Sequence, residues 1–248
     1  GDTTATLAQL RAYGEETWFQ LGDRDFATHV LRTHRLRAGW SPTRVLRAFT
    51  RALGLRAELL PMCDEPVATV VDTPAGELAF QEYFVRRRQR DEVRGVRFAG
   101  IERARVSAEV RAALAQAEAV IFCPSNPIVS IGPILAVPGM RELLRDVPAP
   151  KIAVSPIVGG RALKGPADRM LSGLGHEVSP YGVAALYQDL LGGIVLDRAD
   201  AAHAERVGAL GMRVLVTETV MGGLADRQRL AAEVLRFARD LRDVGGPR

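Results

Sequence analysis

The second half of the chain alternates short apolar runs with segments whose apolar residues recur at helical spacing. The apolar runs predict buried strands at residues 119–123, 152–155, 194–196 and 214–217. The helical spacing predicts helices over residues 108–117, 140–145, 167–174, 183–190, 201–210 and 226–243. Short buried strands separated by helices are typical of a parallel sheet covered on both faces. The pattern therefore predicts an α/β, Rossmann-like fold.

The first half of the chain has a different pattern. Helical spacing predicts a helix from Asp25 to Leu36, and Ser41-Pro42 is a good start for a helix that runs through Leu53. Two β-rich runs, 67–71 and 78–85, flank a Pro-Ala-Gly turn and predict an antiparallel hairpin, with a third strand at 93–98. We interpret residues 60–105 as a hairpin insert or cap within one domain over residues 1–248. The chain opens without a first strand or a glycine-rich loop, as if it begins inside a domain.

The composition is that of an ordinary globular protein. The chain has 248 residues, enough for one large α/β domain, and 47% of them are hydrophobic. No apolar run approaches the roughly 20 residues that span a bilayer, and the amino terminus does not resemble a signal peptide. Cys63 and Cys123 are far apart and lack a CxxC partner, which favours reduced thiols and a cytoplasmic protein.

The charge is close to balanced, with 33 basic and 29 acidic residues and a net charge of +4. Lys151 and Lys164 are the only lysines. Nearly all basic residues are therefore arginines, which bind phosphate and carboxylate bidentately. A codon bias would also produce this excess of arginine over lysine. The densest basic cluster, residues 86–90, lacks the interleaved aromatics of a single-strand binder. It favours a solvated face or a ligand-facing arginine over a nucleic-acid site.

Two loops rich in small polar residues follow predicted strands, at residues 124–133 and 155–160. Open α/β folds bind ligands outside the carboxyl ends of their strands. A helix predicted to start near Ser130 would direct its positive end to the same place, which suits a phosphate. Either loop alone could be an ordinary turn, but together they predict one phosphorylated ligand. The candidate binding residues are Ser125, Asn126, Ser130, Gly132, Ser155, Gly159, Gly160 and Lys164.

Paired carboxylates occur at two places. Asp23 and Asp25 precede a predicted helix, where they could hold metal-bound water, accept a proton or cap the helix. Asp64 and Glu65 precede Pro66 and fit either an Asx-type turn or a carboxylate site. We interpret His29, one helical turn after Asp25, as a hydrogen-bonded core histidine. His176 and His203 show no ligand spacing and are expected at the surface.

Six motifs in this order resemble one family. They are Gly1-Asp2-Thr3 and the segments 21–29, 60–67, 80–85, 124–135 and 155–160. The chain is similar, from Gly1 to about Leu235, to the 2-phospho-L-lactate transferases of coenzyme F420 biosynthesis. Two features depart from the family pattern. The family's glycine-rich loop and acidic metal motif lie upstream of Gly1, so the metal ligands are unknown, and Cys63 stands where the family has serine.

The resemblance implies transfer of a 2-phospho-L-lactate or phosphoenolpyruvate group from a GDP-activated donor to the deazaflavin Fo. GMP leaves, and the product is coenzyme F420-0 or its dehydro form. The resemblance also implies Mg²⁺ as cofactor and a homodimer, without nucleic acid or membrane as partner. We assign catalysis to Asp23 and Asp25, and substrate binding also to Asp2, Thr3 and Asp64. The alternative is a nonenzymatic, nucleotide-sugar-binding regulator of related fold. Such regulators carry a Gly-Pro-Gly-Ser-Leu-Tyr-type loop where Pro124-Ser125-Asn126-Pro127 stands here.

Overall fold

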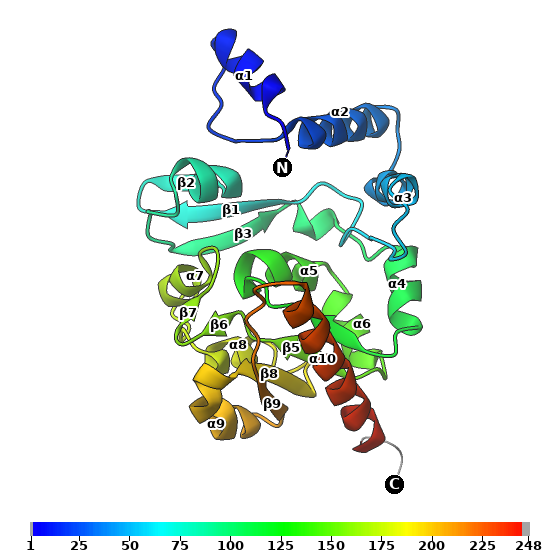
Figure 1. Cartoon of the computed structure of the whole chain (residues 1–248), viewed down its shortest axis with the longest axis vertical. Coiled ribbons are helices and arrows are strands. Elements are labelled where there is room, and N and C mark those ends of the chain that lie inside the picture. Colours follow the sequence, from blue (N-terminus) through cyan, green and yellow to red (C-terminus); the bar gives the residue numbers. More distant parts are fainter. Residues whose placement is uncertain (1, 245–248) are drawn as a thin grey trace.

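Figure 1 shows a computed structural model in which an antiparallel sheet lies between a parallel sheet and an amino-terminal pair of helices. The structure describes residues 2–244. Gly1, the first residue of the Gly-Asp-Thr motif, and residues 245–248 of the predicted domain lie outside the described residues.

The parallel sheet contains four strands in the order β4-β5-β8-β9. They are β4 (Val120–Phe122), β5 (Lys151–Val154), β8 (Gly193–Asp197) and β9 (Arg213–Thr217). Every neighbouring pair is parallel. The four strands that the apolar runs predict, and the Rossmann-like fold class, are therefore confirmed.

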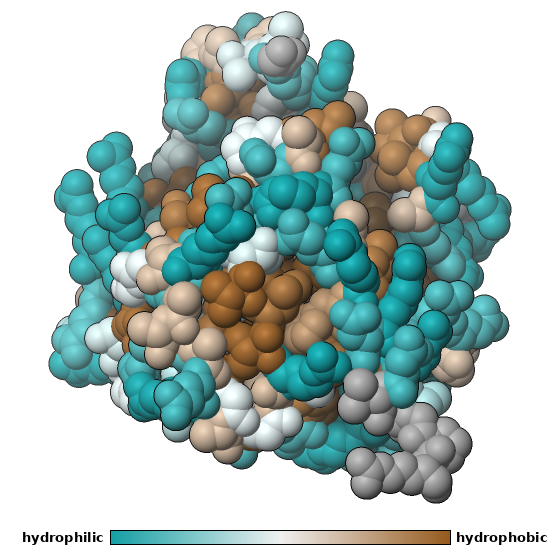
Figure 2. All heavy atoms as spheres, turned by 60° about the horizontal axis from the view of Figure 1, so that its bottom comes forward, coloured by the Kyte–Doolittle hydropathy of each residue, from teal (hydrophilic) through white to brown (hydrophobic). Residues whose placement is uncertain are grey.

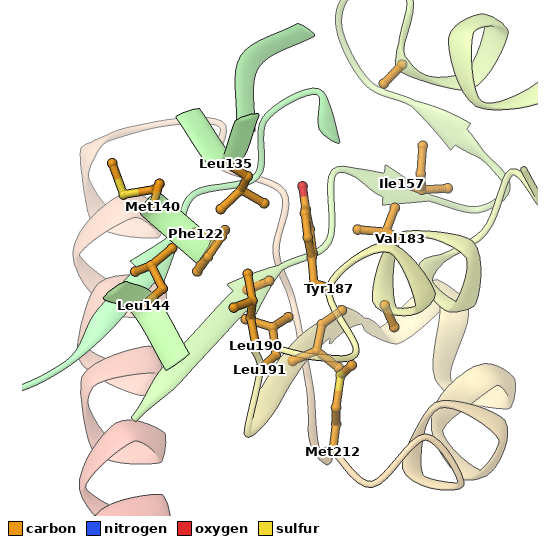
Figure 3. Close-up of a cluster of buried hydrophobic side chains, with 14 of the residues drawn as sticks. Phe122, Leu135, Met140, Leu144, Ile157, Val183, Tyr187, Leu190, Leu191 and Met212 are labelled. Carbon is orange, nitrogen blue, oxygen red and sulfur yellow. The ribbon is translucent and has the colours of Figure 1, made fainter. Parts of the chain in front are cut away.

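The helices that connect these strands all lie on one face of the sheet. They are α5 (Gly132–Ala136), α6 (Met140–Asp146), α7 (Ala167–Gly173), α8 (Pro180–Leu186), the 3-10 helix η4 (Arg198–His203) and α9 (Ala204–Gly208). Each strand is added on the same side of the previous one, and parallel crossovers are right-handed, so every connection crosses the same face. The core cluster of Figure 3 fills the space between these helices and the sheet, with Phe122 and Tyr187 in contact at its centre.

The opposite face of the sheet packs against α10 (Leu224–Val244). Leu230, Val234 and Phe237 of this helix bury Ile152 and Val195 of the strands. Gly193 allows the close approach, because a Cβ atom there would lie 2.8 Å from the ring of Phe237. The predicted helix at 226–243 and the two-sided cover are thus confirmed.

Two predicted helices have different limits in the structure. The helix predicted at 183–190 is α8, which starts at Pro180 after the N-cap Ser179, whose side chain accepts from the backbone N of Gly182. The helix predicted at 201–210 is divided between the end of η4 and α9, which starts at Ala204. The predictions at 108–117, 140–145 and 167–174 correspond to α4 (Ala108–Ala115), α6 and α7.

The antiparallel sheet lies within residues 60–105 and has the order β2-β1-β3. Its strands are β1 (Ala68–Thr73), β2 (Gly76–Ala79) and β3 (Gly95–Ala99), followed by the 3-10 turn η2 (Ile101–Arg103). The predicted hairpin and third strand are confirmed, but the strand prediction for 78–85 is wrong beyond Ala79. The chain turns instead into the π-helical segment η1 (Glu82–Arg86). Tyr83 is thereby fully buried beside Val71 and Met170, and this burial overrides the β-propensity of the segment.

The amino-terminal elements are α1 (Ala5–Ala12), α2 (Asp23–Arg37) and α3 (Pro42–Ala52). The helices predicted from Asp25 and from Ser41-Pro42 are confirmed as α2 and α3, and the Ser41 side chain accepts from the backbone N of Arg44. α1 was not predicted. α1 and α2 lie beyond the antiparallel sheet, away from the parallel strands (Figure 1).

Hydrophilic side chains surround a central apolar area on the face drawn in Figure 2. Within residues 2–244, no single helix has the length and hydropathy needed to cross a membrane. Together, the segments Pro127–Ala136 and Met140–Asp146 meet that test, but they form an 83° bend.

Candidate functional site

A pocket of about 720 Å³ lies where three strands of the parallel sheet end. Loops that follow β4, β5 and β9 line it, which is where open α/β folds bind ligands. The two loops that the sequence singles out therefore meet in one pocket. Of the predicted binding residues it contains Ser125, Asn126, Ser130, Ser155 and Lys164. The residues that were not predicted include Phe80, Phe84, Thr219 and Arg227.

Asn126 shapes the first loop by capping a helix. Its side-chain oxygen accepts from the backbone N of Ile128 at 2.9 Å and of Val129 at 3.3 Å. The π-helical segment η3 (Pro127–Ile131) starts there and continues into α5, so this helix begins three residues before the predicted Ser130. The hydroxyls of Ser125 and Ser130 form no hydrogen bond with another described residue, so both are available to a ligand.

Ser155 shapes the floor of the pocket. It is 1% exposed, and its Oγ donates to the carbonyl of Ile157 at 3.1 Å and accepts from the N of Ile157 at 3.2 Å. This hydroxyl is used within its own turn, which holds the second loop against the end of β5.

Three predicted glycines lie outside the pocket lining. Gly159 and Gly160 form the two-residue turn between β6 (Ile157–Val158) and β7 (Arg161–Ala162). Their φ angles of 59° and 75° suit a type I′ hairpin turn, which favours glycine. Gly132 lies where the cap meets the parallel-sheet body, because a Cβ atom there would be 3.3 Å from the ring of Phe98. These positions explain the glycines by backbone conformation and packing.

Two cationic side chains reach the pocket from different elements. Lys164 lies in the loop between β7 and α7, and Arg227 lies in the first turn of α10. Neither forms an ion pair with another described residue, and none of the described lining residues is acidic. An uncompensated positive pocket with free hydroxyls favours an anionic ligand such as a phosphate ester.

The third loop, after β9, is held by a buried carboxylate. Asp197 is 7% exposed and accepts from Thr219 N at 2.7 Å, Thr219 Oγ1 at 3.0 Å and Ala199 N at 3.0 Å. Burial alone would raise the pKa of Asp197, but these hydrogen bonds outweigh it and the pKa is lowered. This loop was not predicted, although the polar pair Glu218-Thr219 follows its strand as the other two loops follow theirs.

The carboxylates near the amino terminus lie outside this pocket and hold two helices together. Asp23 accepts from Thr3 Oγ1 at 2.5 Å, Ala5 N at 3.0 Å and Thr6 N at 2.9 Å, which caps α1. Asp2 in return accepts from the N of Arg24 at 3.1 Å, at the start of α2. The Thr3 hydroxyl is the main cause of a pKa of Asp23 well below its usual range.

Asp25 caps the start of α2, since its carboxylate accepts from the backbone N of Gly22 at 3.2 Å. The capping alternative therefore accounts for every contact of Asp23 and Asp25, while their catalytic role stays a prediction.

We expect Asp23→Ala to destabilise α1, because three hydrogen bonds at its amino-terminal end lose their acceptor. Faster amide hydrogen exchange in α1 would show this, with turnover per folded molecule unchanged. Glu15→Ala, an exposed carboxylate without a cap contact, is the control. A tenfold lower kcat with normal exchange would instead support the predicted catalytic role.

Asp64 belongs to a second, separate pocket of about 770 Å³, which Trp40 and Cys63 also line. Asp64 accepts from the N of Thr43 at 2.7 Å and from its hydroxyl at 2.8 Å, so it holds the start of α3. Burial raises the pKa of the Cys63 thiol, which donates to the carbonyl of Glu65. These contacts give the acidic motif a structural role.

Three histidines considered as candidate ligands lie in different segments of the chain. His29 is exposed on α2, so its interpretation as a core histidine is wrong: α2 packs no side chain into a core. His176 is exposed as predicted and His203 is half-buried. Within residues 2–244 no three His, Cys, Asp or Glu side chains are close enough to share a metal ion.

Comparison with known proteins identifies relatives across most of the chain. The family model described as 2-phospho-L-lactate transferase CofD matches residues 1–215. A 2-phospho-L-lactate transferase of Methanosarcina mazei is 38% identical over 235 residues, which are 95% of this chain and 77% of that protein. A phosphoenolpyruvate transferase of Streptomyces coelicolor is 39% identical over 242 residues, 95% of this chain and 76% of that protein.

A solved structure supports the fold independently. A UPF0052 family member from Bacillus halodurans matches with a TM-score of 0.57 at 14% identity. The match covers 76% of this chain and 65% of that structure. At this identity the likeness shows the fold alone.

Proposed function

Since this chain belongs to the 2-phospho-L-lactate transferase CofD family and is a transferase, we propose that it acts in coenzyme F420 biosynthesis. The proposed reaction moves a 2-phospho-L-lactate or phosphoenolpyruvate group from a GDP-activated donor to the deazaflavin Fo. The product is coenzyme F420-0 or its dehydro form. Relatives of both kinds match at similar identity, so both donors are part of the proposal.

The observation that carries the proposal is the pocket at the strand ends. Lys164 and Arg227 provide two positive charges, and Ser125 and Ser130 provide free hydroxyl donors. A diphosphate-linked donor presents several phosphate oxygens, which these groups can bind with charge-assisted hydrogen bonds.

The proposed reaction requires little covalent participation by protein side chains. A ribityl hydroxyl of Fo attacks the β-phosphorus, a new oxygen–phosphorus bond forms and the bond to the leaving GMP breaks. The hydroxyl proton passes to water. Enzymes accelerate such displacements mainly by positioning the reactants and stabilising charge on the phosphoryl oxygens. We assign the charge stabilisation to Lys164 and Arg227, and the positioning of the donor to the loop of Ser125 and Asn126.

Mg²⁺, which the family resemblance implies, would neutralise charge on the donor phosphates. The described residues do not fit such a site, since the pocket lining has no carboxylate and no ligand cluster occurs elsewhere within residues 2–244. We therefore assign no step of the mechanism to Mg²⁺. The cytoplasmic location and the homodimer are likewise proposals, and sedimentation of the purified protein tests the second.

The proposal is tested by incubating the purified protein with Fo and each GDP-linked donor in the presence of Mg²⁺. We expect a phosphodiester of Fo and an equal amount of GMP by mass spectrometry. A folded protein that forms no product with either donor would contradict the transfer reaction. The predicted alternative, a nonenzymatic regulator, would bind a nucleotide-sugar without forming product, and the transferase relatives do not support it.

We expect Ser125→Ala to weaken GDP binding by about 1–3 kcal/mol, because a ligand oxygen would lose its hydroxyl donor inside the pocket. Calorimetry measures the affinity. Ser172→Ala, an exposed serine on α7, should bind GDP as the wild type does. An unchanged affinity in the Ser125 variant would assign this loop a structural role only.

A further inference from the structure

Two phenylalanines form an aromatic wall of the pocket. Phe80 and Phe84 are stacked, with ring centroids 5.4 Å apart and an interplanar angle of 9°. They lie four residues apart in a helical segment, which places both side chains on the same side of the chain. Both rings line the pocket, and neither is fully buried.

The wall has a rigid support. Phe80 and Phe84 pack against a cluster of fully or largely buried side chains that includes Val71, Tyr83 and Met170. Tyr83 of the same turn is fully buried in this cluster, whereas Phe80 and Phe84 pack against it and are partly exposed to the pocket. Their orientation is thus set by core packing before any ligand binds, which lowers the entropy lost on binding.

The aromatic wall and a positive charge are close together in the chain's fold. A Cβ atom on Gly165 would lie 4.0 Å from the ring of Phe84, and Gly165 is the direct neighbour of Lys164. The same pocket therefore presents a flat apolar surface and cationic phosphate-binding groups. A ligand that joins a planar ring to phosphate matches both parts.

We propose that Phe80 and Phe84 are a stacking subsite for a planar heteroaromatic ring of the substrate. This inference rests on the proposed function, which offers two such rings, the guanine of the donor and the deazaflavin of Fo. Aromatic side chains stack on flat π-systems with little dependence on the ring's hydrogen-bonding groups. The subsite thus provides affinity for the ring, while Lys164 and Arg227 act on the phosphates.

The test compares three probes by calorimetry with the full protein: GDP, Fo and inorganic pyrophosphate, which has no ring. The variant is Phe80→Leu/Phe84→Leu, which keeps apolar bulk but removes the aromatic faces. We expect at least a tenfold loss of affinity for GDP or for Fo, and an unchanged affinity for pyrophosphate. The probe that weakens identifies the ring that occupies the subsite.

Phe98→Leu is the matched control, because Phe98 is a half-buried aromatic outside this pocket and should leave all three affinities unchanged. Phe84→Trp, which keeps an aromatic face, should retain ring binding. If the double variant binds GDP and Fo as the wild type does, the stacking subsite is wrong while the proposed function stands. If the wild type binds neither GDP nor Fo, both are overturned.

Discussion

Replacing Arg227 by alanine is expected to lower kcat/KM for the GDP-linked donor at least about 100-fold, equal to roughly 2.7 kcal/mol of transition-state stabilisation. Arg227 enters the pocket from the first turn of α10 and has no ion pair with another described residue. Its guanidinium is therefore free to bind phosphoryl oxygens with two parallel hydrogen bonds. Because charge on these oxygens is redistributed during transfer, part of the loss should fall on kcat.

Steady-state kinetics with varied donor measures this effect. Arg239→Ala changes an exposed arginine of the same helix and should leave kcat/KM unchanged. Arg227→Lys keeps the charge but loses the bidentate geometry, so we expect an intermediate rate. Wild-type kinetics in Arg227→Ala would show that this side chain does not contact the reacting phosphates.

Asp197→Asn is expected to lower the free energy of unfolding by about 2–4 kcal/mol, because the amide can accept at only one of the two positions that the carboxylate occupies. One carboxylate oxygen accepts from Ala199 and the other accepts twice from Thr219, so a buried donor would face the amide NH₂. The loop of Thr219 would lose its anchor, so GDP binding should weaken as well. Urea denaturation measures the first effect and calorimetry the second.

The pH dependence gives an independent check on Asp197. Its pKa is lowered in the folded state, so the carboxylate stabilises the fold above its unfolded pKa of about 3.9. This contribution is lost as the pH falls through the lower folded pKa. The stability difference between wild type and Asp197→Asn should therefore be largest near neutral pH and shrink below about pH 4. Asp146→Asn, an exposed carboxylate, should show no loss at neutral pH, and an equal loss in both variants would contradict the anchoring role.

The parallel sheet and its ligand edge were predictable because they depend on local signals. Apolar runs such as Ile194–Leu196 need only a few consecutive residues to indicate a buried strand, and polar loops mark the strand ends. The loop of Ser125 and the loop of Ser155 could therefore be assigned to one edge without knowledge of the contacts between them.

The features of the fold and of the site that were not predicted depend on contacts between residues far apart in the chain. Asp23 caps a helix whose first residues are 17–20 positions earlier, so its partner has no local signature. Arg227 resembles its neighbouring arginines in the sequence, and only the docking of α10 brings it to the pocket. The turn after Ala79 depends on the burial of Tyr83 against Met170, which lies 87 residues further along the chain.

The position of α10 has a consequence for the order of synthesis. Among the described elements, it is the last to be translated, yet it covers β5 and β8 on one face of the sheet and carries Arg227. A ribosome-bound chain that ends before residue 224 exposes Ile152, Val154 and Val195 to solvent, so it is prone to aggregation. That nascent chain also lacks Arg227, the arginine proposed to bind phosphate. Premature truncation should thus yield a protein that is both insoluble and inactive. Only chains whose translation has passed α10 would be able to bind substrate.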